Sequence, residues 1–178
     1  NGGTFTLSAN GEAGFNPGTD FDDLAVGDTR ATEIVYQIDD GNGGTDTAIV
    51  TYTVTGENDP ITPIIPGDPN PPADPNAYIP PQTGEDGTAV TPLDLNPYFT
   101  VLDGDTLTIA ITHADLPGGL TLTNGVISGT PNADASQGGT GGVFTIPVTV
   151  TDGNGDTFTT NVTYTITNPP PVAENDAL

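Results

Sequence analysis

The chain has 178 residues, enough for one large or two small domains. Its 24 Asp and Glu residues accompany a single basic residue, Arg30, and the formal net charge is −23. Nucleic acids and anionic membranes bind proteins through basic patches, so this charge balance excludes both as partners.

The sequence also lacks cysteine and lacks any long apolar run. The sequence has no cysteine, which excludes disulfides and leaves a metal ion as the leading candidate. No apolar run approaches the ~18 residues of a membrane-spanning helix, so no membrane insertion is predicted. The acidic residues occur singly or in pairs beside Gly and Asn, a pattern that favours cation sites over a disordered acidic tail.

The stretches that look ordered are rich in Thr, Val and Ile, and they alternate between apolar and polar residues. This period of two indicates half-buried antiparallel strands, separated by Gly, Asn, Asp and Pro. In chain order, strands are predicted at residues 4–8, 33–38, 48–55, 107–112, 143–151 and 158–167. Short strands with regular turns predict an all-β fold, in which antiparallel Greek-key β-sandwich domains follow one another in tandem.

An internal repeat indicates the domain organisation. DGNGGTDTAIVTYTVTG begins at Asp40, and DGNGDTFTTNVTYTITN begins at Asp152. Each copy is interpreted as a turn followed by the last strand of a domain.

Four segments follow from this repeat. Residues 1–58 are predicted to be the C-terminal part of a domain, with an unpaired sheet edge that a neighbouring strand completes. Residues 59–78 form a Pro-rich, semi-rigid linker whose apolar side chains pack on a domain. Residues 79–168 form a complete domain, and residues 169–178 are a linker with the first strand of the next repeat or of a neighbouring subunit.

Three phrases of residues 79–168 resemble the dystroglycan-type cadherin-like, or Putative Ig, domains of bacterial surface proteins. The phrases are LDLNPYFTVLDGDTLTIAI, LPGGLTLTNGVISGTP and VTVTDGNGDTFTTNVTYTI. YQIDDGNGGTDTAIVTYTVTGENDP is similar to the C-terminal half of a VCBS-type cadherin-like repeat, and PPVAENDAL is similar to the start of a further repeat. The resemblance implies tandem repeats of large secreted adhesins, with calcium at or near the domain junctions.

Calcium binds about six to eight oxygen ligands, which Asp, Glu and Asn on Gly-rich turns supply. The candidate ligands are Asp39, Asp40, Asn42 and Asp46; Glu57, Asn58 and Asp59; Asp103 and Asp105; Asp152, Asn154 and Asp156; Glu174, Asn175 and Asp176; and Glu85. Asp-Gly and Asn-Gly are also common hairpin turns, so each cluster alone is equally consistent with turn formation. The resemblance to cadherin junctions favours the two Glu-Asn-Asp trios, at Glu57 and Glu174.

No enzymatic activity is predicted. The chain has no Cys or Lys nucleophile, its three serines lie in no nucleophile motif, and it has no Trp for a sugar cleft. The only histidine, His113, follows a predicted strand and is assigned an exposed or packing role. Tyr36, Tyr52 and Tyr164 fall on predicted strands and are expected in the core.

The leading hypothesis is a calcium-stabilised structural repeat of a bacterial extracellular adhesin or filament, secreted or on the cell surface. It would act as a stiff spacer in cell adhesion or in a biofilm matrix. Its partners would be adjacent cadherin-like repeats or identical subunits, joined head to tail by strand addition. The alternative hypothesis is a module of an adhesin that binds a glycan or peptide ligand.

Overall fold

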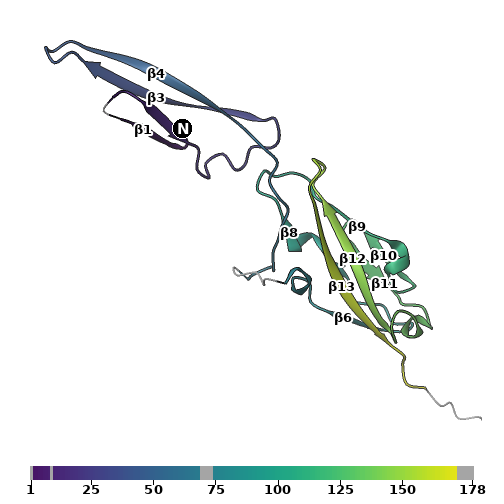
Figure 1. Ribbon diagram of the computed structural model, residues 1–178. Helices are drawn as coiled ribbons and strands as arrows, with labels where there is room; N and C mark the ends of the chain where they lie inside the picture. Colours follow the sequence, from purple (N-terminus) through teal and green to yellow (C-terminus); the bar gives the residue numbers. More distant parts are fainter. Residues whose placement is uncertain (1, 9, 69–73, 172–178) are drawn as a thin grey trace, which may run out of the picture. The chain divides into compact units, whose positions relative to one another are not determined.

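The computed structural model describes residues 2–8, 10–68 and 74–171. The chain forms two compact units (Figure 1). Unit 1 comprises Asn1–Pro60 with Val101–Asp105, and unit 2 comprises Ile61–Thr100 with Thr106–Leu178.

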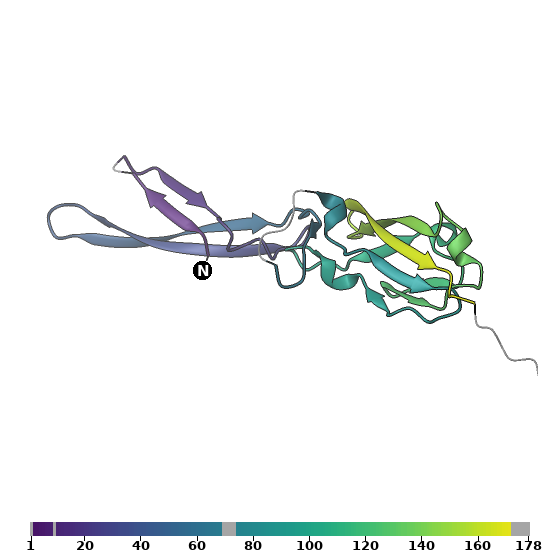
Figure 2. The same cartoon turned by 90° about the horizontal axis from the view of Figure 1, so that it is seen from below.

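Unit 1 consists of two β-hairpins. They are β1 (Thr4–Leu7) with β2 (Ala13–Asn16), and β3 (Thr29–Asp39) with β4 (Thr45–Thr55). The shorter hairpin lies beside the longer one in Figure 1 and runs at an angle to it in Figure 2. Tyr52 of β4 stacks on Phe15 of β2 with 4.9 Å between ring centroids, and its edge also meets Phe5 of β1. This aromatic contact holds the two hairpins together.

Unit 2 is a sandwich of two sheets, with short additional elements. Its strands are β5 (Thr62–Pro63), β6 (Gln82–Glu85), β7 (Leu93–Asp94), β8 (Phe99–Thr100), β9 (Thr108–Ile111), β10 (Leu120–Thr123), β11 (Val126–Gly129), β12 (Val143–Thr151) and β13 (Thr157–Thr167). Its single-turn 3₁₀ helices are η1 (Pro75–Ala77), η2 (Asn96–Tyr98), η3 (His113–Asp115) and η4 (Ala135–Gln137). One sheet has the order β6-β13-β12-β9 and the other β10-β11-β7, while β5 pairs with β8.

The core of unit 2 lies between its two sheets. Leu120 and Ile127 face Ile146, Val148 and Val162 across the sandwich, and all five side chains are fully buried. Such a layer of alternating apolar residues is what a β-sandwich buries. The predicted all-β sandwich is therefore confirmed, and the strand pairs of unit 2 are antiparallel as predicted except for β6 with β13, which is parallel.

The six predicted strands coincide with β1, β3, β4, β9, β12 and β13. The structure extends two of them, because β3 begins at Thr29 and β4 at Thr45. The sheet β10-β11-β7 was not predicted: β7 has two residues and β11 does not alternate, although the Leu-Thr alternation of β10 was a usable signal.

The segment predicted as a linker contributes to unit 2. Ile61 is 5% exposed and belongs to the core, and Tyr78 packs against it. Residues 62–63 form β5, which pairs with β8. From Ile61 onward, the described part of this segment therefore stabilises unit 2.

The two copies of the internal repeat build the same hairpin. The β3–β4 ladder closes at Asp39 opposite Thr45, and the β12–β13 ladder closes at Thr151 opposite Thr157. The alignment of the repeats makes these pairs equivalent. In both hairpins the closing turn is followed by an 11-residue strand, as the repeat predicted.

Tyr164, at the centre of β13, is only 1% exposed, and among the described residues its hydroxyl has no hydrogen-bond partner. Burial raises the pKa of Tyr164 to about 12 from 10.0. An unpaired buried hydroxyl opposes folding, so Tyr164→Phe should leave unit 2 equally stable or up to about 1 kcal/mol more stable in urea unfolding.

A second effect of Tyr164 follows from its pKa. Between pH 10 and 12 the unfolded chain ionises this tyrosine first, so the native protein should lose stability as the pH rises. Tyr164→Phe should remove that loss, while Tyr52→Phe at the equivalent, half-buried position should not. A variant at Tyr164 that loses more than about 1 kcal/mol at neutral pH would show that the hydroxyl has a bonding partner.

Candidate functional site

The two hairpin tips use their acidic side chains to build turns. Asp152 Oδ1 accepts hydrogen bonds from the backbone amides of Asn154, Gly155 and Asp156, at 2.8, 3.0 and 3.1 Å. Asp152 is only 4% exposed. The turn interpretation of this cluster therefore holds in the structure, because one carboxylate oxygen satisfies three backbone donors.

The equivalent tip in unit 1 is exposed. Asp40 Oδ1 accepts hydrogen bonds from the amides of Asn42 and Gly44, at 2.8 and 3.0 Å, and Asp39 Oδ1 accepts one from Gly41 at 2.7 Å. Hydrogen bonds from Asn42 and Gly44 lower the pKa of Asp40 below its usual 3.8. Asp46, just beyond the tip, accepts a hydrogen bond from the amide of Thr47.

A second acidic group forms at the other end of unit 1, beyond β4. Asp103 is 7% exposed and holds two backbone segments through its carboxylate. Its Oδ2 accepts a hydrogen bond from the amide of Asp59 at 3.2 Å, and its Oδ1 accepts one from Asp105 at 3.3 Å. The structure therefore brings together two of the predicted acidic clusters, which are 44 residues apart in the chain.

Asp22 joins this group. The pKa of Asp59 is raised, first by partial burial and then by the negative charges of Asp103 and Asp22. A shallow pocket of about 230 Å³ is lined by Asp22, Glu57 and Asp59, with the end of β4 beside them. We refer to Asp22, Glu57, Asp59 and Asp103 as the acidic site of unit 1.

Asp22 was not among the ligands predicted from sequence. The available signal was the acidic run at residues 20–23, in which three of four residues are Asp. That run lacks the Gly and Asn residues that mark the predicted turn clusters. Only the fold shows that Asp22 lies close enough to Asp59 to raise its pKa.

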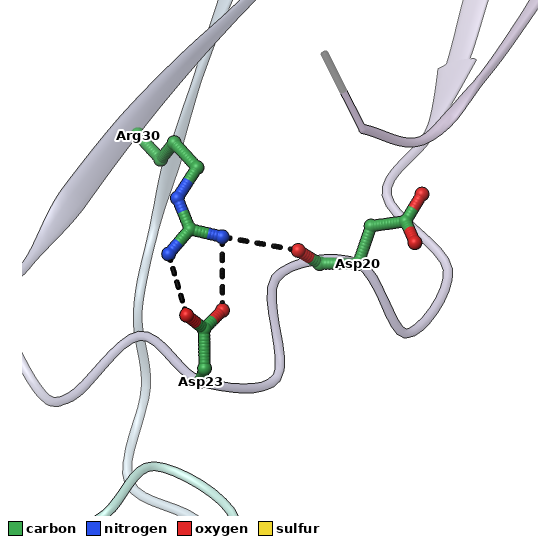
Figure 3. Close-up of polar contacts among 3 residues, drawn as sticks. All are labelled: Asp20, Asp23 and Arg30. Atoms are coloured by element: carbon green, nitrogen blue, oxygen red, sulfur yellow. Dashed lines mark hydrogen bonds and ion pairs between the residues drawn. The ribbon is translucent and has the colours of Figure 1, made fainter.

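Arg30 positions this acidic run. Its guanidinium makes two hydrogen bonds to the carboxylate of Asp23, at 2.6 and 2.9 Å, and one to the carbonyl oxygen of Asp20 at 3.1 Å (Figure 3). The hydrogen bond from Arg30 lowers the pKa of Asp23. Arg30 therefore links the backbone of Asp20 to the side chain of Asp23, on either side of Asp22, and its charge is paired with Asp23.

The remaining candidates take separate positions. Asp156 Oδ2 accepts a hydrogen bond from the amide of Ile61 at 2.9 Å, within unit 2. Glu85, a predicted ligand, is the last residue of β6. The adjacent Asp86 is the buried carboxylate, at 6% exposure. Asp86 accepts hydrogen bonds from the amide and hydroxyl of Ser136, which anchors η4. Glu174, Asn175 and Asp176 lie outside the described residues.

Metal coordination is not preformed in the described part of the chain. No group of three or more Asp, Glu or His side chains there is arranged to hold a metal ion. The acidic site of unit 1 supplies hard oxygen donors from three separate segments, which is the ligand chemistry that calcium prefers. In donor type the site fits calcium, although its carboxylates must move closer to enclose an ion.

A groove of about 430 Å³ lies in unit 2, beside the outer strands β9 and β10. Ile111, Leu116 and Leu122 line it together with His113. His113 is exposed, which agrees with the role that the sequence assigned to it. Among the described helices, none is long and apolar enough to cross a membrane.

The chain is similar to several solved structures, all at low sequence identity. The chain is 14% identical to the protocadherin Gamma B2 extracellular cadherin domains 1–5, covering 98% of this chain and 31% of that one with a TM-score of 0.45. Human desmocollin-1 ectodomain gives 11% identity, coverage of 94% and 31%, and a TM-score of 0.41. The endo-fucoidan hydrolase MfFcnA4 of glycoside hydrolase family 107 gives 16% identity, coverage of 96% and 22%, and a TM-score of 0.45. The chain thus spans less than a third of each of these structures.

No curated protein sequence matches the chain. The family model described as Putative Ig domain matches residues 71–167, which include both sheets of the sandwich in unit 2. The match covers more than half of the chain and contains the three phrases on which the sequence resemblance rests. The chain therefore belongs to the Putative Ig domain family.

Proposed function

We propose that the chain is a calcium-stabilised structural repeat of a bacterial extracellular adhesin or filament. Its role is non-enzymatic: it acts as a stiff spacer in cell adhesion or in a biofilm matrix, at the cell surface or secreted. Its partners are neighbouring repeats or identical subunits joined head to tail. The acidic site of unit 1 is the observation that supports this proposal, because the fold gathers carboxylates from three segments there. Partial burial, and then the charges of Asp103 and Asp22, raise the pKa of Asp59.

The charge distribution explains why a cation would stabilise the acidic site of unit 1. The chain carries a net charge of −23, and its one basic residue, Arg30, is paired with Asp23. Asp59 and Asp103 must therefore stay close without a basic side chain to compensate them. A calcium ion shared by Asp22, Asp59 and Asp103 would turn this repulsion into attraction and would tie residues 101–105 to the end of β4. Such a tie would limit bending within unit 1.

Calcium should raise the melting temperature of unit 1. An ion that binds only the folded state stabilises it by roughly 1.4 kcal/mol at ten times its Kd. For a unit of this size, that corresponds to about 5–10 °C. Extracellular modules bind calcium with a Kd on the order of 0.1–1 mM, so melts in chelator and in millimolar calcium provide the measurement. Identical melting curves would remove calcium from the proposal.

Asp59→Asn should have opposite effects in the two conditions. The pKa of Asp59 in the folded protein lies above its usual 3.8, so ionised Asp59 costs stability at every pH above that range. In chelator, Asp59→Asn should therefore melt at the same temperature as the native protein or higher. In calcium it should melt lower, because the site has lost a charged ligand.

Glu12→Gln is the matched control for Asp59→Asn. It also removes one negative charge from unit 1, but at an exposed position outside the acidic site. The control should keep the full calcium shift. If Glu12→Gln loses as much of the shift as Asp59→Asn, the ion is screening net charge and does not bind at the acidic site.

A further inference from the structure

The outer edge of β4 lacks a partner strand in the described part of the chain. The β3–β4 sheet has two strands there, whereas β13, the equivalent of β4, pairs with β12 on one side and with β6 on the other. The β6 pairing is parallel and runs from Gln82 opposite Tyr164 to Glu85 opposite Thr167. The amide of Asp86 extends it with a hydrogen bond to the carbonyl of Thr167, at 3.0 Å. The repeat therefore shows which kind of strand suits the edge of β4.

The face of the β3–β4 hairpin is also less covered than its counterpart. Ile38 and Tyr36 of β3 are 60% and 36% exposed, but Val150 and Val148 at the equivalent positions of β12 are fully buried. A groove of about 240 Å³ lies there, lined mainly by apolar side chains of β1, β3 and β4. These side chains lie toward the hairpin tip, apart from Tyr52–Thr55, so they show that the face of the hairpin is incompletely covered but do not mark the place of an added strand.

A second phrase of the sequence has the same spacing of prolines and aspartate as the β6 segment. Pro80 and Pro81 precede β6, and Asp86 follows it, in the phrase PPQTGED. The phrase PPVAEND begins at Pro170, with the two prolines and the aspartate at the same spacing. The equivalent of β6 and Asp86 is residues 172–176, and seven residues follow Pro171, so the chain is long enough to supply this strand.

We infer that residues 172–176 of one copy add to the outer edge of β4 in a second copy, as a parallel strand. The register follows from β6 and β13: Val172 lies opposite Tyr52, Asn175 lies opposite Thr55, and the amide of Asp176 donates to the carbonyl of Thr55. This inference deepens the head-to-tail part of the proposed function. Because each copy offers one edge and one strand, the contact is head-to-tail, and it generates a chain of subunits where the rotation between copies does not close a ring.

At one position the added strand has a glutamate where β6 has a glycine. This difference predicts that assembly depends on calcium. Glu174 occupies the position of Gly84, where a Cβ atom would lie 2.9 Å from Val90 and 3.0 Å from Ile166. In unit 1 the matching place beside Val54 is the pocket lined by Asp22 and Glu57, which has room for a side chain. Glu174 would thus approach carboxylates of the other copy, so assembly should require calcium or high salt.

The test compares the full chain with a chain that lacks residues 172–178, by sedimentation velocity at rising protein concentration in millimolar calcium. The full chain should form oligomers whose mass grows with concentration, and the truncated chain should stay monomeric. A full chain that is monomeric at every concentration, or a truncated chain that assembles equally well, would overturn the inference.

A peptide of residues 168–178 tests the register. It should bind the truncated chain and slow amide exchange at Tyr52–Thr55. Asp176→Pro in the peptide removes the donor to Thr55 and should weaken binding by about tenfold or more, the loss of one well-made hydrogen bond. Asp176→Ala is the matched control, since it lacks the same carboxylate but keeps the amide, and it should bind much better. Equal binding of the two variants would contradict the proposed register.

Calcium binding and strand addition can be tested independently. The truncated chain retains the acidic site, so its melting temperature in calcium tests the stabilising role without any strand addition. Binding of the peptide in chelator with high salt tests strand addition without calcium. A truncated chain stabilised by calcium that binds no peptide would overturn only this inference, and peptide binding without a calcium shift would overturn only the calcium site.

Discussion

Leu120→Ala should destabilise unit 2 by about 2–5 kcal/mol, the range for a leucine removed from a packed core. Leu120 is fully buried between the two sheets, where Ile127 and Ile146 belong to the same cluster. The smaller side chain loses apolar burial and leaves a cavity that neighbouring β-strands cannot close easily. The measurement is urea unfolding, with amide exchange of β12 and β13 to assign the loss to unit 2.

Leu102→Ala is the control for the same change of side chain. Leu102 is 63% exposed, so its truncation should alter the free energy of unfolding by no more than about 0.5 kcal/mol. A loss at Leu120 as small as the loss at Leu102 would contradict the sandwich core described for unit 2.

Asp152→Ala should destabilise the β12–β13 hairpin by about 2–4 kcal/mol, measured in chelator so that no metal contributes. The substitution leaves three backbone amides without the oxygen that now accepts their hydrogen bonds. Because Asp152 is buried, water cannot fully replace that oxygen. Asp152→Asn keeps an acceptor in the same place and should lose less than half as much.

Asp40→Ala makes the same change in the exposed copy of this turn. Its amide partners are open to water, so the expected loss is below about 1 kcal/mol. Equal losses at the two positions would show that burial does not govern the strength of this turn. Such a result would also weaken the equivalence of the two hairpins.

The long strands were predictable from sequence because their signal is local. β4 and β13 alternate Thr with apolar residues, and this period of two does not depend on the rest of the fold. The Asp-Gly-Asn-Gly turns at Asp40 and Asp152 were equally readable, since their hydrogen bonds join residues two to four positions apart. Sequence therefore determined both hairpins and the all-β class.

The second sheet of the sandwich was harder to foresee. β7 has only two residues, and β10 and β11 have four each, of which only β10 alternates regularly between apolar and polar residues. The turn between β10 and β11, Asn124-Gly125 with φ of 50° and 78°, was a usable signal, but turns do not show which strands they join. Those strands are stable because they pack on β12 and β13, which is a property of the whole unit.

Some features of the candidate site were likewise readable from sequence, and others depended on the fold. Sequence by itself determined the acidic composition, the repeat and the turns in which carboxylates bind their own backbone. Tertiary structure alone decided that Asp103 holds the amide of Asp59, and that burial, followed by the charges of Asp103 and Asp22, raises the pKa of Asp59. The physical reason is distance along the chain: hydrogen bonds within a turn are fixed by adjacent residues, whereas charges on three separate segments interact only after folding brings those segments together.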